Sequence, residues 1–173
     1  MIRKNGLTLF FTSADSFSNW HIRPFVLKGI TFNCGEQAMM YSKAMLFGDA
    51  VTAQKIMLLQ DPREQKAEGK RVKNFKEEKW HEHREKIIAA ILYHKFTQHE
   101  DFKKLLLSTQ GTEIVEASPY DRIWGIGMGQ NDPNLMDRSR WGQNLLGKCL
   151  MKVREHILKL EKEKHYQANA LSL

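Results

Sequence analysis

The chain has 173 residues, of which 42% are hydrophobic, and it includes four tryptophans and nine phenylalanines. A chain of this length and apolar content can bury one sizeable core, so we expect a single domain over residues 1–160 and a frayed C-terminal tail over residues 161–173. Lysine and arginine (27) outnumber aspartate and glutamate (20), which gives a net charge of +7. This charge permits a polyanionic partner but excludes a histone-like tail, and it equally fits an ordinary solvated basic surface.

No segment reaches the roughly 18 to 20 uninterrupted apolar residues of a membrane helix, and residues 1–11 lack the apolar stretch and cleavage site of a signal peptide. We therefore expect a soluble, cytoplasmic protein. The two cysteines, Cys34 and Cys149, stand singly, without the paired spacing of a zinc site or a disulfide framework. The sequence thus predicts no metal ion, and it favours a reducing compartment.

The first third of the chain predicts strands followed by helices. Two runs rich in aromatic and β-branched residues, 7–11 and 25–32, are typical of strands of a small sheet, and residues 28–29 form a plausible turn within the second run. Aspartate, glycine and proline then delimit three helices, which we expect at residues 35–48, 49–60 and 62–75.

The remainder of the chain is mainly helical. Apolar residues at three-four spacing predict the longest helix over residues 76–96, and further elements are expected as a helix at 100–109, a strand at 112–118, a loop at 118–134 and a helix from 143 past 156. The pattern therefore indicates an α+β fold: a compact, mainly helical single domain with a small β-sheet.

One face of the first predicted helix carries two ionisable groups. At about 100° per residue a step of seven returns to within roughly 20° of its start, so Glu36, Met40, Lys43 and Phe47 share one stripe. The backbones of Glu36 and Lys43 are then about 10 Å apart, which allows their side chains to bracket a small ligand. A purely structural interpretation places Glu36 at a helix N-terminus, where the dipole favours a carboxylate, and lets Lys43 extend to solvent.

Two further segments hold candidate binding residues. Trp80 and Arg84 lie one turn apart on the longest helix, where they could stack on a base and bind a phosphate, although such a tryptophan is more commonly core. Asp121 and Trp124 fall in the loop after the predicted strand, and the glycines that follow them would let the backbone approach a ligand. Turns need glycine too, so a lone Gly-x-Gly is weak evidence for a phosphate site.

Six segments in the same order along the chain resemble the NADAR family, also called the YbiA-like or swarming-motility family. They span residues 17–25 (FSNW…PF), 36–44 (EQAMMYSKA), 79–84 (KW…R), 95–96 (KF), 114–127 (IVEASPYDRIWGIG) and 142–154 (GQNLLGKCLMKVR). The resemblance covers about residues 8–156. It implies a compact, mainly helical α+β fold and an enzyme that cleaves the C1–N bond of a ribosylated amine, without a cofactor.

The resemblance also implies roles for individual residues. Lys43 would be the nucleophile, replacing the base on C1 as a Schiff base that water later hydrolyses. Glu36 would bind ribose hydroxyls or move protons, and Asp121 would be a second acid or base. Trp80 and Trp124 would enclose the base or sugar. The remaining residues expected to bind substrate are Asn19, Arg84, Gly125, Gly127 and Asn144.

Two substrate classes follow from the resemblance: ADP-ribose attached to guanine in DNA, and the ribosylamino-pyrimidine phosphates of riboflavin biosynthesis. The chain departs from the riboflavin-type members at Gln37 and at Met39-Met40, and it carries an inserted segment at residues 130–140 (QNDPNLMDRSR). We expect this basic segment, like the cluster at residues 66–73, to flank the pocket. These departures favour the nucleic acid substrate.

Two rival functions belong to other classes. A module that binds ADP-ribose or a nucleotide without catalysis would not need Lys43, Glu36 and Asp121 together. A nucleic-acid-binding protein that relied only on its basic charge would be expected to carry a groove-reading motif, and the sequence contains none that we recognise.

Overall fold

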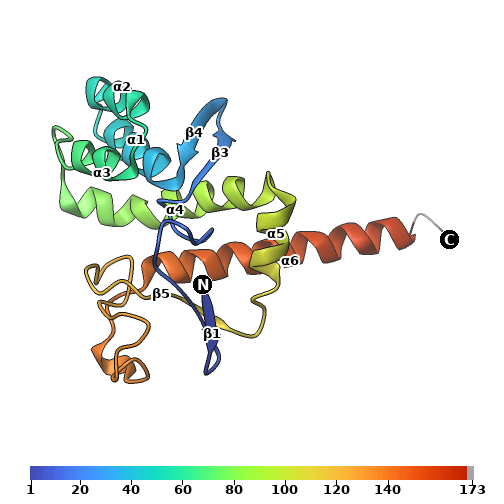
Figure 1. Ribbon diagram of the computed structural model, residues 1–173. Coiled ribbons are helices and arrows are strands. Elements are labelled where there is room, and N and C mark those ends of the chain that lie inside the picture. Colours follow the sequence, from blue (N-terminus) through green and yellow to red (C-terminus); the bar gives the residue numbers. More distant parts are fainter. Residues whose placement is uncertain (171–173) are drawn as a thin grey trace.

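A computed structural model of the chain describes residues 1–170, and within them it contains six α-helices, five β-strands and one 3₁₀ helix. Figure 1 shows a helical body with strands packed against two parts of it. The α+β class is therefore confirmed. The prediction of one small sheet is corrected, because the strands form a three-stranded sheet and a separate two-stranded hairpin.

The three-stranded sheet joins distant parts of the chain in the order β1-β2-β5. β1 (Ile2–Lys4) lies antiparallel to β2 (Leu7–Phe10), and β5 (Glu113–Glu116) lies parallel to β2. β1 was not predicted. Its turn at residues 5–6 is an Asn-Gly pair with φ angles of 51° and 74°, so a hairpin signal was present in the sequence.

The second sheet is the hairpin of β3 (Ile22–Leu27) and β4 (Ile30–Cys34). The turn expected at residues 28–29 is confirmed, since Lys28 and Gly29 have φ angles of 50° and 78°, as this kind of two-residue hairpin turn requires. β4 leads directly into the first helix.

Three short helices follow: α1 (Gly35–Leu46), α2 (Ala50–Leu58) and α3 (Pro62–Gly69). α3 ends six residues before the predicted limit. The chain leaves the helix because Val72 turns into the core and the backbone N–H of Lys73 donates to Asp49, the N-cap of α2. This tie between α2 and the segment after α3 competes with continued helix.

The long helices form the centre of the fold. α4 (Glu77–Thr97) packs against α1 and α6 (Leu145–Ala170), and α5 (Glu100–Leu107) packs beside both long helices (Figure 1). α6 continues as far as Ala170 and so includes most of the segment expected to fray from residue 161, and residues 171–173 lie outside the described part. None of the helices within residues 1–170 is long and apolar enough to cross a membrane.

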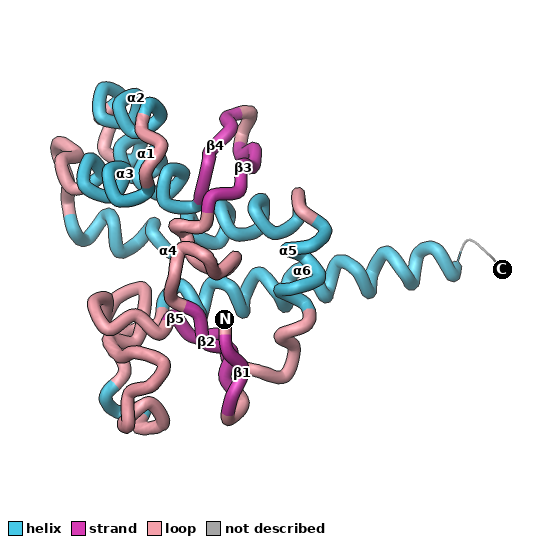
Figure 2. Tube along the Cα trace, in the orientation of Figure 1, coloured by secondary structure: helices cyan, strands magenta, loops and turns pink. Residues whose placement is uncertain are grey.

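Long loops, drawn in pink in Figure 2, connect β5 to α6 beside the three-stranded sheet. They include a 3₁₀ turn, η1 (Arg138–Arg140). Their apolar residues form a second hydrophobic cluster with the sheet, which is separate from the main core between the helices. Its buried members are Leu7, Leu9, Val115, Ala117, Ile126, Met128 and Leu135. The first part of this loop region then forms one wall of the candidate site.

Candidate active site

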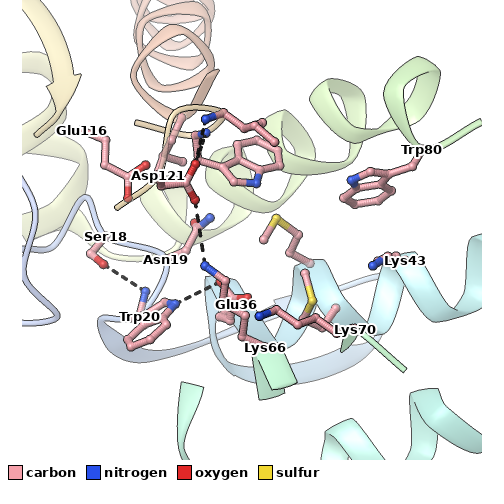
Figure 3. Close-up of a pocket in the computed structure, with 15 residues that line it drawn as sticks. Ser18, Asn19, Trp20, Glu36, Lys43, Lys66, Lys70, Trp80, Glu116 and Asp121 are labelled. Atoms are coloured by element: carbon pink, nitrogen blue, oxygen red, sulfur yellow. Dashed lines mark hydrogen bonds and ion pairs between the residues drawn. The ribbon is translucent and has the colours of Figure 1, made fainter. Parts of the chain in front are cut away.

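A cavity of about 320 Å³ opens between α1, α3 and α4 on one side and the loops before β3 and after β5 on the other (Figure 3). Its lining residues are Ser18, Asn19, Trp20, Glu36, Met39, Met40, Lys43, Lys66, Lys70, Trp80, Glu116, Asp121, Ile123, Trp124 and Leu146. The predicted site residues among them are Asn19, Glu36, Lys43, Trp80, Asp121 and Trp124. The fold thus gathers side chains from six segments of the chain around one cavity, because Leu146 of α6 also lines it.

α1 presents the stripe that its sequence predicts. The helix begins directly after β4, with Cys34 as its N-cap accepting a hydrogen bond from the backbone N–H of Gln37. Glu36 occupies the first turn, where the helix dipole favours a carboxylate. Met40 and Lys43 follow on the same face, and all three residues line the cavity.

Lys43 is half-buried at one end of the cavity. Its Nζ donates a 2.9 Å hydrogen bond to the carbonyl of Gly69 and lies 4.4 Å and 5.9 Å from the ring centres of Phe75 and Trp80. Burial lowers the pKa of the Lys43 amine, and the charge of Glu36 opposes this only in part. The neutral, nucleophilic form of the amine is therefore more accessible than in an exposed lysine.

Gly69 lets α3 approach α1 closely. A Cβ at this position would lie 2.0 Å from the sulfur of Met40, so a larger residue would displace Met40 or separate the helices. The same close approach brings the Gly69 carbonyl within reach of Lys43. This glycine thus helps to position the candidate nucleophile.

Glu36 is buried in the cavity wall, with a side chain that is nearly inaccessible to solvent. Its Oε2 accepts a hydrogen bond of 3.2 Å from Nε1 of Trp20. Burial raises the pKa of Glu36 to about 7, although the charge of Lys66 and the Trp20 hydrogen bond act in the opposite direction. A carboxyl group with such a pKa can both donate and accept protons near neutral pH.

Asp121 is anchored by its own loop and faces α3. One carboxylate oxygen accepts hydrogen bonds of 2.8 Å from the backbone N–H groups of Ile123 and Trp124. The other oxygen lies 3.9 Å from Nζ of Lys66, which also sits 5.8 Å from the ring of Trp20. The loop therefore holds the Asp121 carboxylate rigidly beside a cation, with its second oxygen directed toward the cavity (Figure 3).

Trp80 and Trp124 are half-buried and contribute to the apolar part of the cavity wall, together with Met39 and Met40. Both indoles also pack against the main hydrophobic core. The two interpretations of Trp80 therefore coexist, because one side of the residue supports the core while another faces the cavity. Figure 3 shows Trp80 beside Lys43 at one end and Glu116 at the opposite end.

Three buried oxygens in the lining have no hydrogen-bond partner among the described residues: Oδ1 of Asn19, Oε1 of Glu36 and Oε2 of Glu116. Burial, followed by the charge of Asp121, raises the pKa of Glu116 to about 8. Unpaired buried polar atoms are costly and uncommon in native proteins. Their concentration here fits a ligand that supplies several hydroxyl or amine donors, as a ribosylamine does.

Arg84 and Asn144, which the sequence predicts to bind substrate, are not among the residues that line the cavity. Arg84 is buried between α4 and the start of α6, where its Nη2 donates to Oε1 of Gln143 at 3.1 Å. The Asn144 amide accepts from the backbone N–H of Glu116 at 3.1 Å and donates to the carbonyl of Ile114 at 3.0 Å. Its hydrogen-bonding capacity is thus used to attach the start of α6 to β5.

The two glycines of the loop also face protein and not the cavity. A Cβ on Gly125 would lie 2.8 Å from the carbonyl oxygen of Glu116 and 3.0 Å from that of Asp121. Gly127 has a φ of 72°, and its N–H donates to the Asp121 carbonyl at 3.0 Å. Both glycines let the loop fold tightly on itself and on β5, which positions Asp121 indirectly.

The inserted segment at residues 130–140 does not reach the cavity lining, so the expectation that it flanks the pocket is corrected. Arg138 forms an ion pair with Glu113 and lies 4.5 Å from the ring centre of Trp141. Arg140 pairs with Asp137 at 3.3 Å. Both arginines of the inserted segment thus form ion pairs with acidic residues of the protein.

The candidate residues identified from sequence omitted five polar or aromatic members of the lining: Ser18, Trp20, Lys66, Lys70 and Glu116. Lys66 lies on α3 and Lys70 is the C-cap residue that follows this helix, and the basic cluster to which they belong was expected to flank the pocket. Trp20 adjoins Asn19 in the FSNW segment, and Glu116 ends a strand. Their closeness in sequence to predicted site residues or segments was the signal that could have identified them.

The arrangement combines an amine with a lowered pKa, ionisable carboxyl groups and aromatic walls. Such a set can support nucleophilic addition to an electrophilic carbon with proton transfers on either side of it. Within residues 1–170 no cluster of three or more histidine, cysteine or acidic side chains is arranged to hold a metal ion.

The chain is similar to proteins of known family. The NADAR domain model matches residues 9–158. The N-glycosidase R617 of Acanthamoeba polyphaga mimivirus is 45% identical over 121 residues, covering 69% of this chain and 71% of that protein. The protein irg-1 of Caenorhabditis elegans is 34% identical over 172 residues, covering 90% of this chain and 81% of that protein.

A third relative links sequence to structure. The N-glycosidase YbiA of Escherichia coli is 29% identical over 159 residues, covering 90% of this chain and 91% of that protein. The NMR structure of E. coli YbiA matches the fold with a TM-score of 0.75 at 26% identity, covering 95% of this chain and 91% of that chain. The chain therefore belongs to the NADAR domain family, and with it to the N-glycosidases.

Proposed function

We propose that this N-glycosidase removes ADP-ribose from guanine bases in nucleic acid through a Schiff base on Lys43. The observation that carries the proposal is the position of a half-buried amine of lowered pKa in the same cavity as Glu36 and Asp121. A lysine must be neutral to attack carbon, and burial favours that form.

In the proposed reaction, the ribosylamine opens to an iminium at C1, and Nζ of Lys43 adds to that carbon. The exocyclic amine then leaves with a proton, while C1 stays bonded to Lys43 as a Schiff base. Water adds to C1, the C1–Nζ bond breaks, and the free sugar and the lysine amine are released. Glu36 and Asp121 are the groups placed to exchange these protons or to bind the ribose hydroxyls.

The preference for an ADP-ribosyl substrate rests on charge. Lys66 and Lys70 give the cavity two cationic side chains besides Lys43, which suits a pyrophosphate. The difference from the riboflavin-type members at Gln37 does not bear on the choice of substrate, because the Gln37 side-chain amide is buried. Its oxygen accepts a hydrogen bond from the backbone N–H of Asn33, and its nitrogen donates one to the carbonyl of Ile56. The inserted segment likewise lies outside the cavity. The two cysteines are free and buried, which suits the cytoplasm as the proposed location.

The alternative substrate is a ribosylamino-pyrimidine phosphate of riboflavin biosynthesis, which has the same kind of C1–N bond but one phosphate. A module that only binds ADP-ribose is the alternative of another class. The lowered pKa of Lys43 argues against that module, because recognition of a phosphate would gain from a permanently charged lysine.

The test offers each substrate separately to the purified protein. We expect free sugar from guanine-ADP-ribosylated DNA, and borohydride added during turnover should trap a sugar adduct on the wild type but not on Lys43→Ala. Release only from the ribosylaminouracil phosphate would establish the riboflavin-type substrate instead. Binding of ADP-ribose without release from either compound would support the non-catalytic module.

A further inference from the structure

A second cavity of about 550 Å³ adjoins the first. The two share the lining residues Ser18, Trp20, Lys66, Glu116 and Asp121. Lys43 belongs only to the first cavity, and the proposed function assigns no occupant to the second. Because they have five lining residues in common, one elongated ligand can reach from Lys43 into the second cavity.

Two aromatic rings line the second cavity but not the first, and they do not belong to the hydrophobic core. Phe11 and Tyr120 have ring centres 6.3 Å apart at an interplanar angle of 49°. Their exposed fractions are 38% and 88%. Neither ring belongs to the hydrophobic core clusters, so their exposure offers a stacking surface for a planar aromatic ligand.

Two cationic residues of α3 contribute to the same cavity as these rings, and one of them, Lys66, also lines the first cavity. Arg63 and Lys66 are three residues apart on one helix face, and both line the second cavity. No ion pair of the Arg63 side chain occurs among the described residues, and its guanidinium is therefore available to bind phosphate bidentately. The second cavity thus offers a phosphate-binding group next to a stacking surface.

Glu116 lies at the junction of the two cavities, with its Oε2 buried and without a partner in the described part of the chain. Its raised pKa keeps much of this carboxyl group protonated near neutral pH. A neutral carboxyl does not repel an anionic phosphate that passes it, and it can donate a hydrogen bond to a phosphate oxygen.

We propose that the second cavity is a subsite for a nucleoside monophosphate group: an aromatic base at Phe11 and Tyr120, linked through phosphate at Arg63 to the sugar that reacts at Lys43. This inference rests on the proposed function for the identity of the reacting sugar. It extends that function by making the part of the substrate retained on the sugar a determinant of selection, so that a ribosylamine bearing a single phosphate leaves the subsite empty.

The experiment measures binding of AMP to the full-length protein by isothermal titration calorimetry. Tyr120→Ala should weaken AMP binding about tenfold, since one stacked base contributes roughly that much. Arg63→Ala should weaken binding of AMP and of inorganic phosphate alike. Tyr166→Ala is the matched control, because Tyr166 is also an exposed tyrosine but lies on the distal part of α6.

AMP binding no tighter than that of inorganic phosphate, or unchanged by Tyr120→Ala and Arg63→Ala, would overturn the subsite. Lys43→Ala should still bind AMP, which separates this test from the test of the reaction. A wild-type protein that forms the borohydride adduct but fails to bind AMP would retain its proposed function and lose the subsite. A wild-type protein that binds AMP with the expected variant effects but forms no borohydride adduct would retain the subsite and lose the proposed Schiff-base reaction.

Discussion

The indole Nε1 of Trp20 donates a hydrogen bond of 3.2 Å to Oε2 of Glu36, so the loop before β3 holds the carboxyl group that α1 presents to the cavity. This hydrogen bond favours the charged form of Glu36, whereas burial favours the neutral form. The protonation of Glu36 near neutral pH therefore depends on a residue that lies 16 positions away in the sequence.

We expect Trp20→Phe to raise the pKa of Glu36 further, because burial then acts without the opposing hydrogen bond. If Glu36 must be ionised, kcat/KM at pH 7 should fall by roughly two- to tenfold and recover at higher pH. Trp141→Phe is the control, since its indole donates to the Leu135 carbonyl outside the cavity. A pH profile of kcat/KM identical to that of the wild type would show that this hydrogen bond does not control a required carboxylate.

The site of covalent attachment distinguishes the three lysines that line the cavity. Peptide mass spectrometry after borohydride trapping should place the sugar on Lys43. Lys43→Ala should lower kcat by about 10³-fold or more, because it removes the nucleophile. Lys66→Ala and Lys70→Ala should raise KM and still form the adduct. An adduct on Lys66 or Lys70 in the wild type would contradict the assignment.

Trp80→Ala should raise KM more than it lowers kcat, because the indole forms a cavity wall next to Lys43. Loss of one stacking contact corresponds to about 1 to 3 kcal/mol. Steady-state kinetics on folded protein would measure this, with Trp80→Phe as an intermediate case. Unfolding of both variants by circular dichroism would mean that the residue serves the core alone.

The raised pKa of Glu116 predicts a pH dependence of stability. The folded state holds this proton up to a pKa of about 8, whereas the unfolded state loses it at the ordinary glutamate pKa of 4.5. The contribution of the protonated Glu116 carboxyl to the stability of the fold is thus fully present below pH 4.5 and is lost as the pH rises toward 8. Relative to the wild type, Glu116→Gln should become more stable between pH 5 and pH 9.

Thermal unfolding of Glu116→Gln and of the wild type, each at pH 5 and at pH 9, provides the measurement. About 2 to 4 °C in Tm corresponds to each kcal/mol for a chain of this size. Glu78→Gln, an exposed residue in the first turn of α4, is the control. A Tm difference between Glu116→Gln and the wild type that stays constant from pH 5 to pH 9 would refute a raised pKa in the folded state.

Asn144→Ala tests whether this residue supports the fold or binds substrate. The change leaves the Glu116 N–H and the Ile114 carbonyl without the amide, and we expect the free energy of unfolding to fall by about 2 to 4 kcal/mol. Chemical denaturation would measure the loss, with exposed Asn131→Ala as the control. A higher KM at unchanged stability would instead support the substrate-binding role that the sequence predicts.

Local features of the fold were predictable from the sequence. The turn at residues 28–29 follows from the conformational freedom of glycine, and the shared stripe of Glu36 and Lys43 follows from the helical period of α1. α3 was predicted too long because its helix propensity competes with a distant contact between Asp49 and Lys73, which no local pattern reveals.

The sequence by itself thus determined the helical stripe with its two ionisable groups and, through six ordered segments, the NADAR resemblance. Only the tertiary structure decided which neighbouring side chains face the same cavity. Trp20 and Glu116 enter it, whereas the Asn144 amide is used between β5 and α6. The physical reason is that helical or strand periodicity fixes the face on which a residue lies, while long-range packing decides what that face meets.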